Sequence, residues 1–157
     1  MQWEIISFGS HKTDFINRGV AQYQKWIVPY IRVTDRNLPS GGDLRTHARE
    51  QILCKECEKL VQYICTDDRM VLLDPSGDML SSEEFAQWIH HQRIYQTFGK
   101  LVFVIGGSLG FSSSAVNQAY RVISLSRMTM THEFARLILY EQIYRAMKMI
   151  NNEPYHY

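Results

Sequence analysis

The stretch LVFVIGGSLG, residues 101–110, joins an uninterrupted apolar run to a glycine-rich turn. Residues 101–105 show no polar alternation, as expected for a strand that is buried on both faces in the middle of a parallel sheet. Glycines directly after such a strand allow a sharp turn and let a ligand approach the backbone closely. The glycine spacing matches neither the dinucleotide-binding fingerprint nor a P-loop, so the turn alone also fits a plain strand-to-helix connection.

Around this strand, strands and helices alternate along the chain. We expect strands at residues 3–8, 30–38, 70–74, 101–105 and 122–125. We expect helices at residues 14–28, 43–63, 81–96, 112–120 and 134–150, and a capping box of Ser81 and Glu84 opens the third. Repeated alternation predicts an α/β fold, with a mostly parallel sheet and helices on both faces. A length of 157 residues fits a single domain, residues 1–157.

The first two of these helices have apolar residues at helical spacing and polar residues opposite. The residues expected to face the core are Phe15, Val20, Tyr23 and Ile27 in the first, and Leu44, Ile52, Leu60 and Ile64 in or just after the second. The chain's three cysteines, Cys54, Cys57 and Cys65, fall in or beside the second helix. Their odd number argues against a disulfide framework, and no second ligand pair follows for zinc. We therefore expect reduced structural thiols and no metal.

The composition is that of a globular protein, but it does not show whether the protein binds nucleic acid. Apolar residues make up 45% of the chain and charged residues 21%, an ordinary globular mixture. No run approaches the roughly 20 apolar residues of a membrane span, and the N-terminus lacks the features of a signal peptide, so we expect a cytoplasmic protein. The formal net charge of +1 neither requires nor excludes nucleic acid. An RNA-binding face would need local clustering of basic residues or the joining of two subunits.

The loops after three strands are the places to look for a ligand, because open α/β sheets bind ligands at the carboxyl ends of their strands. These loops follow Leu73, Ile105 and Leu125. The third reads LSRMTMTH over residues 125–132, and its leucine and two methionines could hold an adenine ring. The alternative is that Met128 and Met130 only fill the core.

The last helix and the tail that follows it carry further candidates. Residues 134–150 are apolar nearly all round, which suggests that a partner subunit covers one face. Arg136 interrupts this pattern, and a buried charge is rare unless it is paired or functional. The tail ends in Tyr155, His156 and Tyr157. These residues could stack on a base and handle a proton, or they could form a loose terminus.

Taken together, LVFVIGGSLG, ISLSRMTMTHEFARLILYEQIYRA and EPYHY resemble the RlmH-type branch of the SPOUT methyltransferases in order and spacing. The N-terminal strand and the helix that contains KECE, residues 55–58, also fit, so the resemblance covers essentially the whole chain. It implies a C-terminal trefoil knot over roughly residues 70–157 and an obligate homodimer. It also implies S-adenosylmethionine as cofactor. The residues implied to hold it are Leu73, Gly106, Gly107, Leu125, Arg127, Met128, Thr129, Met130, Thr131 and His132.

The implied reaction is methylation of N3 of pseudouridine 1915 in 23S ribosomal RNA, within the assembled ribosome. His156 is the candidate for taking the N3 proton or orienting the base, and Tyr155 for stacking on it. Arg136 is a third candidate, for contacting phosphate or stabilising the developing anion. Two other functions stay open: a non-catalytic ribosome-binding module with the same fold, and a nucleotide-binding oxidoreductase.

Overall fold

Five parallel strands form one sheet in the order β2-β1-β4-β3-β5. The computed structural model describes residues 2–95 and 99–155. The strands are β1 (Gln2–Phe8), β2 (Arg32–Leu38), β3 (Arg69–Met79), β4 (Leu101–Ile105) and β5 (Arg121–Ser124). The helices are α1 (Asp14–Ile27), α2 (Arg49–Tyr63), α3 (Ser82–Ile94), α4 (Ser113–Gln118) and α5 (His132–Ile150). The predicted parallel α/β sheet is confirmed.

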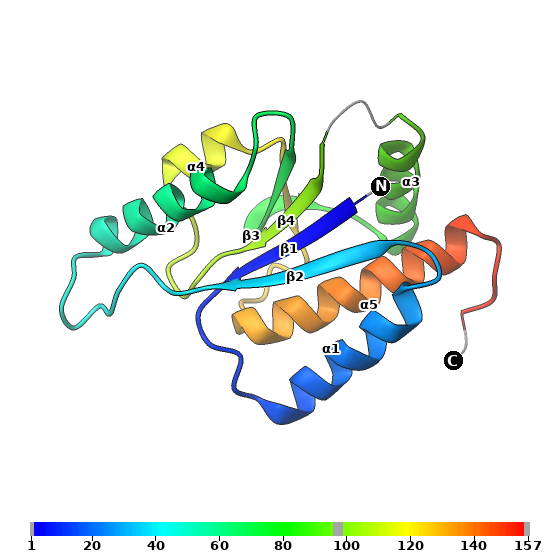
Figure 1. Ribbon diagram of the computed structural model, residues 1–157, viewed down its shortest axis with the longest axis horizontal. Coiled ribbons are helices and arrows are strands. Elements are labelled where there is room, and N and C mark those ends of the chain that lie inside the picture. The colour runs from blue at the N-terminus through cyan, green and yellow to red at the C-terminus, as the bar shows by residue number, and fades with distance from the viewer. Residues whose placement is uncertain (1, 96–98, 156–157) are drawn as a thin grey trace.

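Helices cover both faces of the sheet, as the buried strands require (Figure 1). Successive side chains of a strand point to opposite faces, so the central strands contribute to two cores. On β4, Phe103 packs in a cluster with α1, α3 and α5, whereas Val104 packs in a second cluster with α2 and α4. All five residues of β4 are buried. The uninterrupted apolar run of β4 therefore reflects its central position.

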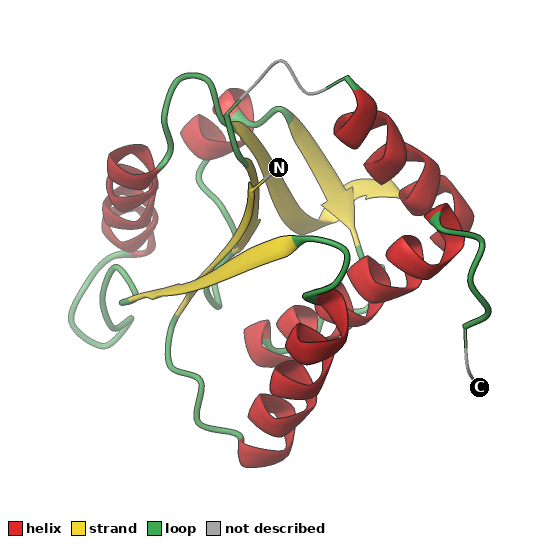
Figure 2. Cartoon of the chain, turned by 45° about the vertical axis from the view of Figure 1, so that its right-hand side comes forward, coloured by secondary structure: helices red, strands yellow, loops and turns green. Residues whose placement is uncertain are grey.

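Helices α1 and α5 lie side by side on one face of the sheet (Figure 2). Gly19 of α1 allows this close approach, because a Cβ atom there would lie 3.0 Å from Cδ1 of Leu137 on α5. Val20 and Ile27 are buried as predicted and Tyr23 packs at the edge of the core, but Phe15 is 60% exposed. The prediction of Phe15 as a core residue is wrong.

The predicted helix over residues 43–63 begins only at Arg49. The Asp43 carboxylate accepts a hydrogen bond from the backbone N–H of Arg45, and the Asp43 carbonyl accepts one from that of His47, which makes a separate turn. Leu44 in this turn is 58% exposed, so its assignment to the core is wrong as well. Ile52 and Leu60 are buried, and Ile64 packs against the second cluster.

Strand β3 continues beyond the predicted end at Asp74 and reaches Met79. The register against β5 shifts between Leu73 and Asp78, so the loop expected after Leu73 is an irregularity within the strand. A Cβ atom at Gly77 would lie 2.7 Å from the carbonyl carbon of Val122. Glycine thus allows the displaced segment to run against β5 before pairing resumes.

The remaining boundaries differ from the prediction by one or two residues. The capping box is confirmed: Oγ of Ser81 accepts from the N–H of Glu84, and the Glu84 carboxylate accepts from the N–H of Ser81. Helix α3 ends at Ile94, and the predicted end at residue 96 lies outside the described residues. None of the helices within the described residues is long and apolar enough to cross a membrane. Cys57 is half-buried, whereas Cys54 and Cys65 are exposed, and all three are free thiols.

Candidate active site

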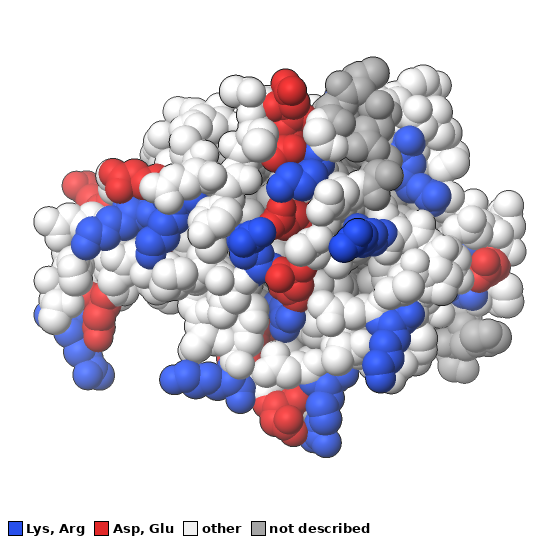
Figure 3. All heavy atoms as spheres, in the orientation of Figure 1, with Lys and Arg blue, Asp and Glu red and all other residues white. Residues whose placement is uncertain are grey.

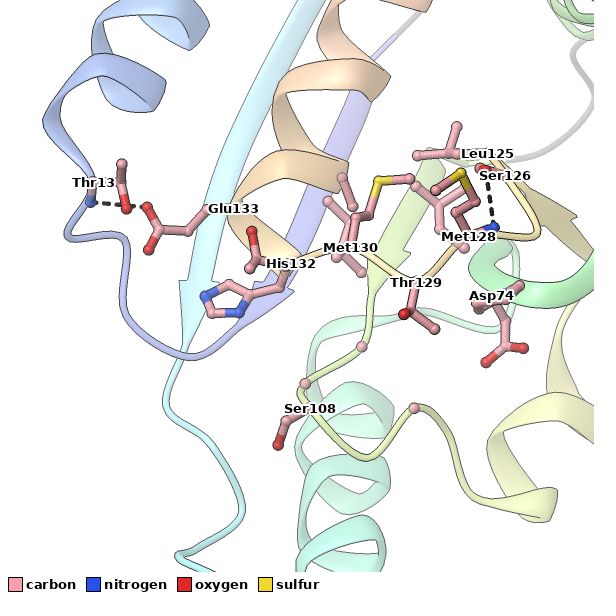
Figure 4. Close-up of a pocket in the computed structure, with 18 residues that line it drawn as sticks. Thr13, Asp74, Ser108, Leu125, Ser126, Met128, Thr129, Met130, His132 and Glu133 are labelled. Carbon is pink, nitrogen blue, oxygen red and sulfur yellow. Dashed lines mark hydrogen bonds between the residues drawn. The ribbon is translucent and has the colours of Figure 1, made fainter.

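A cavity of about 820 Å³ lies beside the middle of β3 and at the carboxyl ends of β4 and β5 (Figure 4). Residues 73–75 of β3 and the loops that follow β4 and β5 line it, together with the first turn of α5. Its volume lies within the range of ligand pockets, roughly 300–1,000 Å³. Nine of the predicted cofactor-binding residues line it: Leu73, Gly106, Gly107, Leu125, Met128, Thr129, Met130, Thr131 and His132. The tenth, Arg127, is exposed and does not line the cavity.

The glycine turn after β4 is shaped by close backbone contacts. Gly107 and Gly110 form an isolated antiparallel bridge, and the N–H of Gly110 donates to the carbonyl of Gly107 over 3.2 Å. Gly110 has φ +75°, a conformation that favours glycine. A Cβ atom at Gly106 would lie 3.1 Å from both the Gly110 carbonyl oxygen and the Phe111 ring. The turn therefore presents backbone to the cavity at positions where side chains do not fit.

The loop over residues 125–132 forms the apolar wall. Oγ of Ser126 accepts a hydrogen bond from the N–H of Met128 over 3.0 Å, which fixes the turn (Figure 4). Met128 is 78% exposed, so the alternative that it fills the core is wrong. Met130 is half-buried and packs against the first core cluster. An exposed methionine on a cavity wall is suited to cover a flat apolar ligand.

Hydrogen bonds connect the first turn of α5 to the loop after β1. Nε2 of His132 lies 3.1 Å from the carbonyl oxygen of Ser10, and it carries the proton in this contact because a carbonyl only accepts. The His132 ring accordingly points away from the methionine wall (Figure 4). The Glu133 carboxylate accepts from the N–H groups of Thr13 and Lys12, over 2.9 Å and 3.3 Å. These bonds, the one from Thr13 above all, lower the pKa of Glu133.

Asp74 places a carboxylate in the cavity, across from the methionine wall (Figure 4). Its Oδ1 accepts from the N–H and the hydroxyl of Ser76, over 2.9 Å and 2.6 Å. Its Oδ2 faces Gly110, because a Cβ atom there would lie 3.4 Å away. The cavity thus combines an apolar wall, a backbone turn and the carboxylates of Asp74 and Glu133. That combination fits a ligand with a flat ring and a cationic centre.

Arg136 lies outside the cavity and is already paired. Its guanidinium forms an ion pair with Asp35 of β2, and its Nη1 donates to Oδ1 of Asn17 over 3.4 Å. Arg136 is 9% exposed. Gln24 and Tyr140 also donate to the Asp35 carboxylate. The geometry places Arg136 as a link between α5, β2 and α1, which does not support a direct contact with RNA phosphate.

As far as Tyr155, the last described residue, the tail folds back along α5, and Tyr155 does not line the cavity of its own chain. Oη of Tyr155 donates to the Glu141 carboxylate over 2.7 Å, and the Arg145 guanidinium lies 3.9 Å from the centre of the Tyr155 ring. Burial, followed by the bond to Glu141, raises the pKa of Tyr155. Tyr155 thus contacts the middle of α5, whereas the cavity lies at the helix start. The other tail candidate, His156, lies outside the described residues.

Other cavity residues escaped the sequence analysis: Thr13, Asp74, Pro75, Ile105, Ser108, Gly110, Ser126, Glu133 and Ala135. Most of them flank predicted ones, so the rule that ligands bind at strand ends would have found them. Thr13 and Glu133 are different, because their contact joins residues 120 positions apart. Within the described residues, no three His, Cys, Asp or Glu side chains gather to hold a metal ion.

Comparison with known proteins agrees with this geometry. The sequence profile of a family described as "Predicted SPOUT methyltransferase" matches residues 1–156. A protein named Ribosomal RNA large subunit methyltransferase H from Kosmotoga olearia is 43% identical, over 100% of both chains. Proteins of the same name from Carboxydothermus hydrogenoformans and Dictyoglomus thermophilum are each 40% identical, over 99% and 100% of both chains. With a strand-end cavity and full-length matches of this kind, the chain belongs to the SPOUT methyltransferase family.

Proposed function

We propose that this protein is an S-adenosylmethionine-dependent methyltransferase that acts on N3 of pseudouridine 1915 in 23S ribosomal RNA. Its substrate would be the assembled ribosome, in the cytoplasm. The observation that carries the proposal is the cavity, in which residues 73–75 of β3 and the loops after β4 and β5 supply an apolar wall, a glycine turn and the Asp74 carboxylate. The full-length relatives, named as ribosomal RNA methyltransferases, support the substrate class.

The cavity residues suit the proposed cofactor. Leu125, Met128 and Met130 would hold the adenine, and the backbone at Gly106 and Gly107 would pass close to it. Asp74 would lie near the cationic part, since a carboxylate in a partly enclosed site favours positive charge. When bound, the cofactor supplies a methyl group activated by its sulfonium. The protein itself would bind, orient and shield the reacting groups.

Methyl transfer is an in-line displacement, so alignment of the acceptor with the methyl group is the main requirement. Holding two reactants in position can supply roughly 7–11 kcal/mol of the barrier, without strong acid–base catalysis. The N3 proton of the pseudouridine must also leave. His156 is our candidate to accept that proton or to orient the base, and Tyr155 to stack on the base.

We further propose a homodimer in which the tail of one chain completes the cavity of the other. Two observations support this arrangement. Tyr155 docks on the middle of α5, away from its own cavity. Phe15 and Trp26 of α1 and Phe134 of α5 are 60%, 45% and 43% exposed, which leaves apolar surface on these two helices for a partner to cover. The trefoil knot over roughly residues 70–157 is part of the same proposal.

The charge distribution is compatible with a pre-shaped RNA surface. In Figure 3, basic and acidic side chains are interspersed on the face shown and do not form one continuous basic patch. Such a surface is poorly suited to bind naked duplex by charge alone. A folded ribosomal site recognised by shape would demand less basic surface from the enzyme.

The decisive experiment is a methylation assay with labelled S-adenosylmethionine and three acceptors from a strain that lacks the modification. The acceptors are intact ribosomes, free large subunits and protein-free ribosomal RNA. We expect label in 23S RNA from intact ribosomes, mapped to the pseudouridine. Label on none of the acceptors, despite measurable cofactor binding, would favour a non-catalytic ribosome-binding module. Preference for a nicotinamide cofactor would favour an oxidoreductase.

A further inference from the structure

One face of α2 is directed at the glycine turn. Arg49, Ile52 and Glu56 are spaced i, i+3 and i+7, which places them on the same side of a helix. Nη2 of Arg49 donates to the carbonyl oxygen of Leu109, inside the turn, over 3.2 Å. Glu56 lies two turns further along and also lines a smaller cavity of about 370 Å³ with Ser108 and Leu109. The helix therefore meets the turn at two points.

Glu56 is a buried carboxylate that holds a second loop. It is 5% exposed, although Glu50, Lys55 and Glu58 of the same helix are exposed. Its Oε1 accepts from the N–H of Gly41 over 3.0 Å and from the hydroxyl of Ser40 over 3.2 Å. A buried carboxylate is costly unless it is hydrogen-bonded, so these bonds fix both the side chain and the loop. Nζ of Lys59 donates to the carbonyl oxygens of Pro39 and Ser40, which fastens the same loop again.

The same carboxylate lies against Gly107. A Cβ atom on Gly107 would lie 3.1 Å from Oε1 and 3.4 Å from Oε2 of Glu56, closer than to any other group outside the turn. A side chain at Gly107 would therefore press on the Glu56 carboxylate. Gly41 meets the backbone of Ile52 on the other side of the carboxylate, where a Cβ atom would not fit.

We propose that Glu56 is a positioning residue for the cofactor, acting through Gly107. Its carboxylate is wedged between the 40–42 loop and the turn and sets how far the turn extends into the cavity. This inference rests on the proposed function, because it names S-adenosylmethionine as the ligand whose binding depends on the turn. It gives a role to the KECE segment, which the cavity itself does not use.

The first test measures the Kd of the purified protein for S-adenosylmethionine by calorimetry. Glu56→Ala should raise Kd about tenfold, because it removes two buried hydrogen bonds and the support behind the turn. Glu56→Gln should stay within about threefold of wild type, because its amide oxygen can still accept from Gly41. Glu58→Ala, on the same helix but exposed, is the matched control and should leave Kd unchanged.

The second test is a double-mutant cycle between Glu56 and Gly107. Gly107→Ala should weaken cofactor binding in the wild-type background, because its methyl group meets the carboxylate and shifts the turn. The same change should cost several-fold less in the Glu56→Ala background, where that space is free. Equal losses in both backgrounds would mean that the methyl group clashes with the cofactor itself, and would overturn the positioning role.

Stability is checked by thermal unfolding of each variant. Should Glu56→Ala not fold, Ser40→Ala removes one of the two bonds to Oε1 without altering α2 and should still raise Kd, by about threefold. An unchanged Kd in Ser40→Ala would then count against the proposal. If the wild-type protein bound no S-adenosylmethionine, the proposed function would be overturned. If the wild-type protein bound it and Glu56→Ala bound it equally tightly, only the positioning role would be overturned.

Discussion

At the scale of single residues, Arg136 shows how burial changes the reading of a charged side chain. An arginine in an apolar helix suggested a contact with RNA, but the guanidinium forms an ion pair with Asp35 and a hydrogen bond with Asn17. We predict that Arg136→Ala lowers the free energy of unfolding by about 3 kcal/mol, because it leaves the Asp35 carboxylate buried without its ion partner. Urea unfolding at neutral pH measures this loss.

The double variant Asp35→Asn, Arg136→Met is the control for that prediction. It removes both charges, so it should be more stable than Arg136→Ala by about 1 kcal/mol or more. If Arg136→Ala kept wild-type stability and instead raised the KM for ribosomes, the direct RNA contact would be right and the structural link wrong.

The residues of the cavity could largely be anticipated, but their directions could not. Strand-end loops are readable from the sequence, and nine of ten predicted cofactor residues line one cavity. The direction of the His132 ring depends on the Ser10 carbonyl, over a hundred residues away in the chain. The exposure of Met128 likewise depends on the hydrogen bond to Ser126, which residue type alone does not reveal.

At the scale of elements, Glu4 forms ion pairs that link β1 with β2 and with the residue just before β4. Its carboxylate on β1 accepts from Arg36 of β2 and from Lys100 just before β4, each over 2.7 Å. Burial alone would raise its pKa, but the hydrogen bonds from Lys100 and Arg36 outweigh burial and lower the pKa below the ordinary 4.5. The folded protein therefore binds this proton less tightly than the unfolded chain, so Glu4 stabilises the fold in its ionised form.

This linkage gives a pH prediction. Glu4→Gln should lower the free energy of unfolding by about 1–3 kcal/mol at pH 7, because two charge-assisted bonds are weakened. The difference from wild type should persist down to about pH 4.5 and then shrink as the pH falls through the lower folded pKa. Urea unfolding between pH 3 and 7 measures it. A difference that grew towards low pH would mean that Glu4 is protonated in the fold.

The pairing of α1 with α5 depends on Gly19. We predict that Gly19→Leu destabilises the protein by about 1–3 kcal/mol, because extra carbons would be forced against Leu137. Gly19→Ala should be nearly neutral, since alanine favours helix by about 1 kcal/mol and the flexible Leu137 side chain can move slightly. Thermal unfolding compares the two. Equal effects of alanine and leucine would show that the helices do not pack closely at this point.

Two elements could not be predicted from sequence, for identifiable reasons. Residues 43–48 have helical spacing and form one turn, in which the Asp43 carbonyl accepts from the N–H of His47 as in an α-helix. The turn does not continue, because Ala48 takes an extended conformation and α2 begins only after it. Strand β3 was expected to stop at Asp74, because Pro75, Ser76 and Gly77 are residue types common in turns. Pairing with β5 resumes after the register shift between Leu73 and Asp78, and this long-range contact produces no periodic pattern in the local sequence.

At the scale of the whole molecule, the parallel sheet follows from the alternation of strands and helices along the chain and from the apolar run of β4. A strand that is apolar on both faces is typical of the middle of a parallel sheet covered by helices on both sides. Strand order is less accessible. The neighbours β4 and β1 are separated by most of the chain, and nothing in their local sequences specifies the pairing. The resemblance to a family supplied what periodicity could not, the expectation of a C-terminal trefoil knot.

The proposed composite site makes a prediction that only a dimer can satisfy. A tail variant, Tyr155→Ala with His156→Ala, and a cavity variant, Thr129→Trp, should each be inactive alone. When the two variants are mixed in equal amounts and allowed to exchange subunits, half of the resulting dimers would contain one chain of each variant. Each mixed dimer would have one site with an intact cavity and an intact tail, which gives about one quarter of wild-type activity. A tail that served its own chain would give no recovery, because neither chain of a mixed dimer carries both intact parts.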